Sequence, residues 1–174
     1  MQQHHYKIIV NYDNCTGCRG CEMVCSLNMW GECNPSRAAI RNIRTEQNGL
    51  VSTIPVVCQQ CQDAICEAVC PVDAISRNAD TGALIVDKEK CLGCRRCVYS
   101  CPFGGASLDP VTLQSSKCNL CDGDPQCVKM CPKDALDFVR VDRLGDFKKR
   151  KSLTNYIQFL KISHNSLVPN VPPK

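Results

Sequence analysis

The chain has 174 residues, of which 44% are hydrophobic and 5% aromatic, and it carries 17 cysteines and a formal net charge of +4. No apolar stretch approaches the roughly 20 residues that span a bilayer, and residues 1–13 lack the apolar segment of an export signal, so we expect a soluble, cytoplasmic protein. The positive charge does not indicate a nucleic-acid partner, because the one dense basic run, Lys148–Lys151, contains no aromatic residue.

Short β-branched segments between turn residues predict strands at Lys7–Tyr12, Ser52–Val57 and Ala83–Asp87. The sequence Asn34-Pro35-Ser36-Arg37 predicts a turn, and Asn48-Gly49 predicts the turn of a hairpin. A further hairpin turn at Asp80-Thr81-Gly82 leads into the third strand.

The C-terminal segment differs from the rest because it contains no cysteine after Cys131. A helix over Ser152–Ile162, capped by Ser152, would place one apolar face on Leu153, Tyr156, Ile157 and Leu160. An apolar stripe on a small domain needs a surface to bury it. We therefore expect residues 144–174 to form an arm that packs on a partner subunit, with a frayed terminus as the alternative.

Sixteen of the seventeen cysteines form four runs of four. The runs are Cys15, Cys18, Cys21, Cys25; Cys58, Cys61, Cys66, Cys70; Cys91, Cys94, Cys97, Cys101; and Cys118, Cys121, Cys127, Cys131. A proline follows the last three runs, and the third run has the C-x-x-C-x-x-C-x-x-x-C-P spacing of bacterial ferredoxins. Each run is therefore predicted to supply the thiolates of a cubane 4Fe-4S cluster.

Disulfides and zinc are the alternative interpretations of so many cysteines. A secreted disulfide scaffold would need an oxidising compartment, and zinc sites usually pair two C-x-x-C knuckles across a longer spacer. Three closely spaced thiols with a more distant fourth favour a cubane instead. Because the apolar core of this chain is thin, we expect the metal to supply much of the folding free energy.

In two-cluster ferredoxins the last cysteine of a run ligates the other cluster. Applied here, this rule predicts four crossed ligand sets. They are Cys58, Cys61, Cys66 with Cys101; Cys91, Cys94, Cys97 with Cys70; Cys15, Cys18, Cys21 with Cys131; and Cys118, Cys121, Cys127 with Cys25. The first run lacks a following proline and the fourth has a wide gap, so the outer pair is where a missing or three-iron cluster would occur, leaving three cubanes.

The runs predict an α+β fold of nested two-cluster ferredoxin-like modules with short strands, short helices and a C-terminal extension. The inner module, residues 58–114, would contain the second and third runs. The outer module, residues 1–57 and 115–143, would contain the first and fourth. Glycines such as Gly17 and Gly93 would let the backbone wrap around each cluster.

Clusters also change the charge of the chain. An oxidised core with four thiolates carries 2−, so four clusters would bring the formal +4 to about −4. Basic residues beside the cysteines would then act as local compensation. They are Arg19, Lys90, Arg95, Arg96, Lys117, Lys129 and Lys133.

Two residues near the first run stand outside this scheme. Cys33 belongs to no run, and we interpret it as a small buried apolar residue, with an auxiliary ligand or redox thiol as the alternative. Trp30 is interpreted as a packing residue rather than an electron relay.

Together, Cys15-Thr16-Gly17-Cys18-Arg19-Gly20-Cys21-Glu22, Asn34–Arg37, Cys58-Gln59-Gln60-Cys61, Cys70-Pro71, Cys91-Leu92-Gly93-Cys94 and Cys118-Asn119-Leu120-Cys121-Asp122 resemble the four-cluster electron-transfer subunits of the dimethyl sulfoxide reductase type. The resemblance covers residues 7–140. In nitrate-reductase-like members a tryptophan replaces one cysteine of the third run, whereas Cys97 occupies that place here and favours four cubanes. Cys25-Ser26 followed by Asn34–Arg37 looks most like the small subunits of tungsten aldehyde oxidoreductases and class II benzoyl-coenzyme A reductase.

The resemblance implies a non-catalytic subunit that passes single electrons to or from a tungsten- or molybdenum-pterin catalytic subunit, with a second redox subunit as a further partner. No nucleophile–base constellation, G-x-G-x-x-G motif or P-loop contradicts this expectation. Two alternatives remain open: an electron-transfer subunit of a hydrogenase or carbon monoxide dehydrogenase-linked complex, and a free polyferredoxin.

Overall fold

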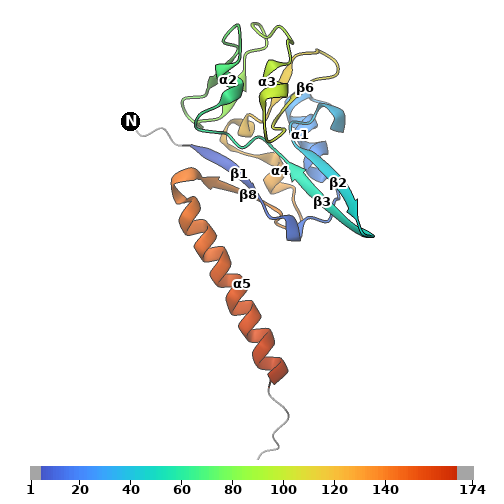
Figure 1. Cartoon of the computed structure of the whole chain (residues 1–174), viewed down its shortest axis with the longest axis vertical. Coiled ribbons are helices and arrows are strands. Elements are labelled where there is room, and N and C mark those ends of the chain that lie inside the picture. The colour runs from blue at the N-terminus through green and yellow to red at the C-terminus, as the bar shows by residue number, and fades with distance from the viewer. Residues whose placement is uncertain (1–4, 168–174) are drawn as a thin grey trace, which may run out of the picture. The chain divides into compact units, whose positions relative to one another are not determined.

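The computed structural model describes residues 5–167, with the side chains of residues 155 and 158–167 outside the description. The chain divides into two units, residues 1–140 and 141–174. The first unit contains β1 (Tyr6–Val10), α1 (Gly20–Trp30), β2 (Arg41–Gln47), β3 (Leu50–Val56), α2 (Ile65–Ala68), β4 (Ile75–Arg77), β5 (Leu84–Val86), α3 (Arg96–Ser100), β6 (Ala106–Leu108), β7 (Ser115–Lys117), α4 (Gln126–Lys129) and β8 (Leu136–Arg140) (Figure 1). The second contains α5 (Leu144–Leu167).

The first and last strands of the first unit pair with each other. Strands β1 and β8 are antiparallel, with register from Tyr6 opposite Arg140 to Val10 opposite Leu136. The rings of Tyr6 and Phe138 stack with centroids 4.9 Å apart. The two ends of the 5–140 segment are thereby closed onto each other.

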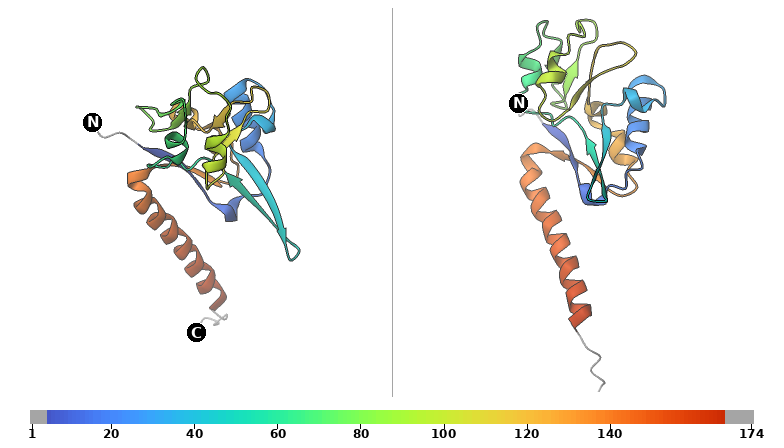
Figure 2. Two further views of the ribbon diagram at one scale, coloured as in Figure 1. Left: turned by 45° about the horizontal axis from the view of Figure 1, so that its top comes forward. Right: turned by 45° about the vertical axis from the view of Figure 1, so that its right-hand side comes forward.

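Three further hairpins lie between these two strands in sequence: β2–β3, β4–β5 and β6–β7. The turn of β2–β3 consists of Asn48 and Gly49, whose φ angles of 53° and 77° match a type I′ turn, and it projects from the unit in the left view of Figure 2. In the β4–β5 hairpin, Asn78 Oδ1 accepts hydrogen bonds from the amides of Asp80 and Thr81. Both predicted hairpin turns are confirmed.

The buried residues form two clusters that combine cysteine with small aliphatic side chains. The larger includes Ile8, Cys25, Ile40, Cys58, Cys118 and Leu136, and the smaller includes Cys66, Ile75, Leu84 and Cys97. Helices α1 and α4 are in contact, and so are α2 and α3, which lie side by side in Figure 1. The coarse fold prediction, a small unit of short strands and short helices, is confirmed.

Two boundary predictions need correction. Each predicted strand exists, but its ends lie one to two residues from the predicted ones. The predicted turn at Asn34–Arg37 is a 3₁₀ turn over Pro35–Arg37, capped by the Asn34 side chain, which accepts from the amide of Ser36. The first run also differs from the other three, because Cys25 lies within α1, whereas the last cysteine of each other run follows a short helix.

The C-terminal helix is longer than predicted. It begins at Leu144, so Ser152 lies inside it and the predicted cap is wrong. The basic run before Ser152 consists of good helix formers, and Asp146 in the first turn stabilises the positive end of the helix dipole. Leu153, Tyr156 and Ile157 are exposed, and the side chain of Leu160 lies outside the described residues. Within residues 5–167 no helix combines the length and the apolar character needed to cross a bilayer.

Candidate metal centres

The four C-x-x-C loops share a left-handed residue at the same position. The residue before the second cysteine of each run has a positive φ: Gly17 at 71°, Gln60 at 49°, Gly93 at 68° and Leu120 at 59°. At Gly93 a Cβ atom would lie 2.5 Å from the carbonyl oxygen of Leu113, so the predicted need for glycine is confirmed there. This left-handed residue curls each loop around the space that its cysteines share.

The fourth cysteine of every run accepts a backbone N–H at sulfur. In the last three runs the donor is the residue four positions later: Ala74 to Cys70 at 3.2 Å, Gly105 to Cys101 at 3.3 Å and Ala135 to Cys131 at 3.3 Å. In the first run the donor is Ala39, whose N lies 3.4 Å from Cys25 Sγ. Hydrogen bonds of this kind stabilise a thiolate and raise the potential of the cluster that it holds.

Three cavities are each lined by three cysteines of one run and the last cysteine of another. The first contains Cys70, Cys91, Cys94 and Cys97; the second contains Cys15, Cys18, Cys21 and Cys131; the third contains Cys25, Cys118, Cys121 and Cys127. These are three of the four crossed sets expected from the spacing. Each cavity offers four sulfur atoms around a common space, which is the donor set of a cubane.

Members of the remaining set meet around Lys117 and Gly105. The Nζ atom of Lys117 lies 3.5 Å from Cys58 Sγ, and the charge of Cys66 contributes to the raised pKa of Lys117. Gly105 donates to Cys101 Sγ, and a Cβ atom on Gly105 would lie 2.6 Å from Cys58 Cα. Cys61 is half-buried, and its carbonyl accepts a hydrogen bond from Arg77 Nη2.

Burial opposes ionisation of the free thiols. It raises the pKa of Cys127 to about 12, and burial followed by the charge of Glu22 raises the pKa of Cys21 to about 11. Burial also raises the pKa of Cys118 well above its usual value. These thiols would stay protonated at neutral pH on their own, so a bound metal core must replace their protons.

The sulfur atoms also fit a core larger than one ion. Within the described residues, no three His, Cys, Asp or Glu side chains come close enough to chelate a single metal ion. The thiols instead surround cavities, as a core of several metal and sulfide atoms requires. The residues present therefore fit iron–sulfur clusters, which would supply one-electron chemistry when bound.

Polar side chains that the cysteine pattern did not reveal also face the sulfurs. Asn42 Nδ2 lies 3.5 Å from Cys15 Sγ. Ser115 donates its amide to Cys91 Sγ at 3.4 Å, and its Oγ lies 3.2 Å from Cys97 Sγ. No sequence signal singles out Ser115, because the polar run Ser115–Lys117 predicts an exposed segment, whereas the structure places it in a fully buried strand.

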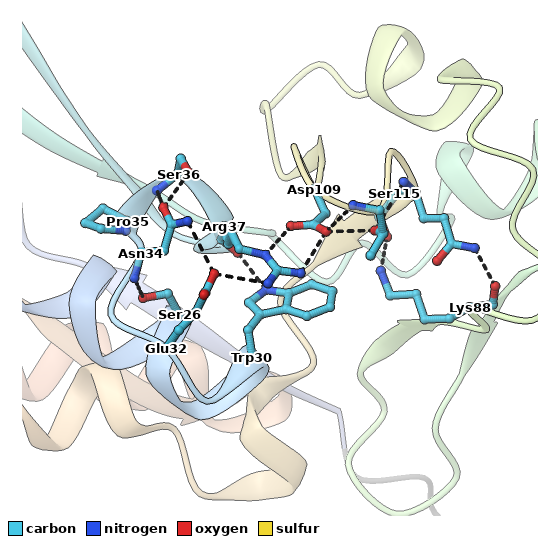
Figure 3. Close-up of polar contacts among 12 residues, drawn as sticks. Ser26, Trp30, Glu32, Asn34, Pro35, Ser36, Arg37, Lys88, Asp109 and Ser115 are labelled. Carbon is cyan, nitrogen blue, oxygen red and sulfur yellow. Dashed lines mark hydrogen bonds and ion pairs between the residues drawn. The ribbon is translucent and has the colours of Figure 1, made fainter.

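The structure shows the surroundings of the two residues near the first run that belong to no ligand set. Cys33 is exposed, so the prediction of a buried residue is wrong: the turn after α1 faces solvent and leaves its side chain outside the core. It lines none of the three sulfur cavities. Trp30 packs against Arg37, whose Cζ lies 4.0 Å from the ring centroid, and donates Nε1–H to the Arg37 carbonyl (Figure 3).

Comparison with known proteins places this arrangement in a class. Residues 50–141 match the 4Fe-4S dicluster domain. The chain is 36% identical over 151 residues to the thiosulfate reductase electron transfer subunit PhsB of Salmonella typhi, covering 80% of this chain and 78% of PhsB. It is 31% identical over 157 residues to a subunit of the anaerobic dimethyl sulfoxide reductase of Escherichia coli, covering 80% of this chain and 75% of that subunit. Among solved structures it is similar to the active site complex BamBC of benzoyl coenzyme A reductase, at 23% identity and a TM-score of 0.46 over 86% of this chain and 89% of that one.

These matches define an iron–sulfur electron-transfer subunit of the oxidoreductases rather than a catalyst in its own right. The chain belongs to the 4Fe-4S dicluster domain family. The resemblance predicted from the cysteine motifs is thereby confirmed, and iron–sulfur clusters are its cofactors. The number of clusters, their ligands and the metal of the catalytic partner remain predictions.

Proposed function

We propose that the chain holds four 4Fe-4S clusters and passes single electrons through them to or from a tungsten- or molybdenum-pterin catalytic subunit of the aldehyde oxidoreductase or benzoyl-coenzyme A reductase type. The observation that carries this proposal is the set of three cavities, each lined by three cysteines of one run and the last cysteine of another. A crossed arrangement joins distant segments through the metal. Such links stabilise a chain whose apolar core is thin.

The ligand sets that we propose are the four crossed ones. Three correspond to the cavities, and the fourth consists of Cys58, Cys61, Cys66 and Cys101. Support for the fourth set comes from Gly105, which donates to Cys101 Sγ and lies against Cys58. The left-handed residue that the four C-x-x-C loops share before their second cysteine supports a cluster at each run.

The nested arrangement of modules is also part of the proposal. Pairing of β1 with β8 and contact of α1 with α4 support an outer module built from residues 1–57 and the segment that contains the fourth run. Contact of α2 with α3 supports an inner module that begins at residue 58. Since β7 pairs with β6, we assign Ser115–Lys117 to the inner module and begin the returning outer segment after it, up to residue 143.

The exposure of the cysteines supports an electron path with one end in each module. Cys18 and Cys94 are exposed and belong to different modules, whereas Cys58 and Cys118 are buried. The Gln60 side chain donates to the carbonyl of Cys118. This hydrogen bond joins the two modules beside the buried Cys58 and Cys118. We propose that electrons enter or leave near Cys18 and Cys94, with one end facing the catalytic subunit and the other a second redox partner.

The arm of residues 144–174 is proposed to dock on a partner subunit. The side chains of Leu153, Tyr156 and Ile157 are 58%, 57% and 43% exposed along α5. Apolar residues at this spacing on one helix face are typical of a surface that another chain covers.

Anaerobic purification of the native complex tests the proposal. We expect about sixteen irons and as many acid-labile sulfides per chain, together with a co-purifying pterin subunit that contains tungsten or molybdenum. In the isolated subunit, Cys18→Ala should lose about four irons, whereas Cys33→Ala, an exposed cysteine outside every set, should lose none. A colourless protein with zinc or disulfides would overturn the cluster assignment, and nickel in the partner would instead favour a hydrogenase or carbon monoxide dehydrogenase complex.

A further inference from the structure

The buried strand β7 is unusual because all three of its residues are polar. Ser115, Ser116 and Lys117 are 3%, 2% and 4% exposed. Alternate residues of a strand point to the same face, so the Ser115 and Lys117 side chains share one face. Ser115 contacts Cys91 and Cys97, and Lys117 contacts Cys58. One short strand therefore serves two of the proposed ligand sets with different chemistry.

Lys117 lacks the partner that a buried ammonium normally has. Among the described side chains, no carboxylate oxygen lies within 4.0 Å of its Nζ atom. It donates to the sulfur of Cys58, and Cys66 lies near enough for its charge to act on the ammonium. Burying a charge without compensation costs several kcal/mol, so negative charge at these two sulfurs must balance the ammonium.

The groups that face the other proposed sets differ from Lys117. Asn42 donates from a neutral amide to Cys15, Ser115 donates its backbone amide to Cys91, and the Ser115 hydroxyl oxygen accepts from the Cys97 thiol. Lys88, a half-buried lysine nearby, donates Nζ–H to the Ser115 carbonyl rather than to a sulfur. Arg19, beside Cys18, is 56% exposed and paired with Glu22.

We propose that Lys117 is a fixed counter-charge that raises the reduction potential of the cluster held by Cys58, Cys61, Cys66 and Cys101. The inference rests on the proposed function, because it requires a cluster in that set. One electron from a neighbouring cluster takes the core from 2+ to 1+, and the core with its four thiolates from 2− to 3−. A buried ammonium at the thiolates stabilises the more negative state more strongly, since charges interact strongly where solvent is excluded.

The raised reduction potential would affect the path of the electron. Cys58 lies near the junction of the two modules, because the Gln60 side chain in the same C-x-x-C loop bonds to the Cys118 carbonyl. A raised potential there makes this cluster the position that fills first when one electron enters the inner module. Lys117 would thus set where the electron rests before it crosses to the outer module.

Redox titration of the isolated four-cluster protein, followed by electron paramagnetic resonance, tests the proposal. The signal of this cluster is identified as the one lost in Cys61→Ala. In Lys117→Met we expect that signal to titrate at a more negative potential, with at least a tenfold change in the equilibrium constant, or about 59 mV for one electron. Lys117→Arg keeps the charge and should titrate close to wild type. Lys90→Met, which removes a 59% exposed lysine paired with Asp87, should leave that signal unchanged.

Iron and sulfide analysis of each variant separates this proposal from the proposed function. Clusters that are present, with the same potential in Lys117→Met as in wild type, would overturn the role of Lys117 and leave the function intact. Loss of the cluster in Lys117→Met but not in Lys117→Arg would support it, because the charge would then be needed to hold the cluster at all. Loss in both would show that Lys117 serves packing, and would overturn it. A wild-type protein without iron would overturn the function itself.

Discussion

The guanidinium of Arg37 binds both carboxylate oxygens of Asp109, with Nε 2.6 Å from Oδ1 and Nη2 2.9 Å from Oδ2. Asp109 is fully buried, and its Oδ2 also accepts from the amide and hydroxyl of Thr112. Figure 3 shows this pair between the loop that follows α1 and the segment that leads to Ser115. The ion pair joins residues 72 positions apart, and so fastens the loop between α1 and β2 to the segment that leads from β6 into β7, the strand that faces two ligand sets.

Replacing Asp109 by Asn should destabilise the protein strongly. The change leaves the Arg37 charge buried without its counter-ion, and the loss of one partner of a buried pair typically costs about 3 kcal/mol or more. An anaerobic urea titration followed by visible absorbance should show a lower midpoint. Asp124→Asn is the matched control, because its pair with Lys129 is 61% exposed at Asp124 and 59% exposed at Lys129, and a solvent-exposed ion pair contributes little to stability. Equal midpoints for the two variants would contradict the role given to Asp109.

The same pair predicts a dependence on pH. Hydrogen bonding to Arg37 lowers the pKa of Asp109 to about 2, below the value of about 3.9 for an unfolded chain. A lowered folded-state pKa means that the stabilisation is complete above about pH 4 and is lost as pH falls towards about 2. Because the sulfide of the clusters is released in acid, the titration is confined to about pH 5 and above, where Asp109 is ionised in the folded and the unfolded chain. The difference in urea midpoint between wild type and Asp109→Asn should therefore be constant from about pH 8 to about pH 5. A difference that shrinks as the pH falls from about 8 to about 5 would show that the pKa of Asp109 is not lowered by Arg37.

Crossed ligation makes opposite predictions for two double variants. If Cys70 serves the cluster of the third run, Cys70→Ala with Cys91→Ala removes two ligands of one cluster, and about four irons should be lost. Cys70→Ala with Cys58→Ala then affects two clusters, and about eight irons should be lost. Ligation within each run would reverse the two results. Iron and sulfide analysis of both anaerobically purified proteins therefore decides between the two arrangements.

The cysteine runs allowed the candidate sites to be predicted because iron–sulfur ligation is local for three of every four sulfurs. The positive φ at Gly17 and Gly93 follows from the same short loops. The donor to Cys25 could not be predicted, because Ala39 lies 14 positions away and reaches it only through the loop after α1. In the other runs the donor is four residues on and belongs to the repeated motif.

The sequence pattern could not predict the long-range electrostatic interactions. Asp109 has no feature in the sequence that singles out Arg37 as its partner, and Lys117 looked like any basic residue beside a cysteine. Burial distinguishes them: Asp109 is 0% and Lys117 4% exposed. Cys33 was wrongly predicted to be buried because the preference of cysteine for the interior is a general one, and it is overridden here by a turn that faces solvent.

Gly105 should not tolerate a larger residue. A Cβ atom there would lie 2.6 Å from Cys58 Cα and 3.2 Å from Cys58 Cβ, so the backbone beside a proposed ligand would have to move. We expect Gly105→Ala to destabilise the protein by about 1 to 3 kcal/mol and to perturb the signal that is lost in Cys61→Ala. Gly145→Ala is the control, because nothing lies within 4 Å of the added Cβ and alanine favours the helix. An unchanged urea midpoint and spectrum for Gly105→Ala would show that this close approach is not needed.

Gln60 should couple the two modules through its buried amide. Its Nε2 donates to the Cys118 carbonyl at 2.7 Å, and its Oε1 accepts from the Leu84 amide at 2.8 Å. Gln60→Met keeps the approximate volume but leaves a buried carbonyl and a buried amide unpaired, and each unpaired group typically costs about 1 to 3 kcal/mol. Gln59→Met is the neighbouring control, since Gln59 is half-buried and makes one hydrogen bond, to the Val57 carbonyl. A clearly lower urea midpoint for Gln60→Met alone would establish the coupling. Similar midpoints for the two variants would show that the Gln60 side chain only fills space between Cys58 and Cys118.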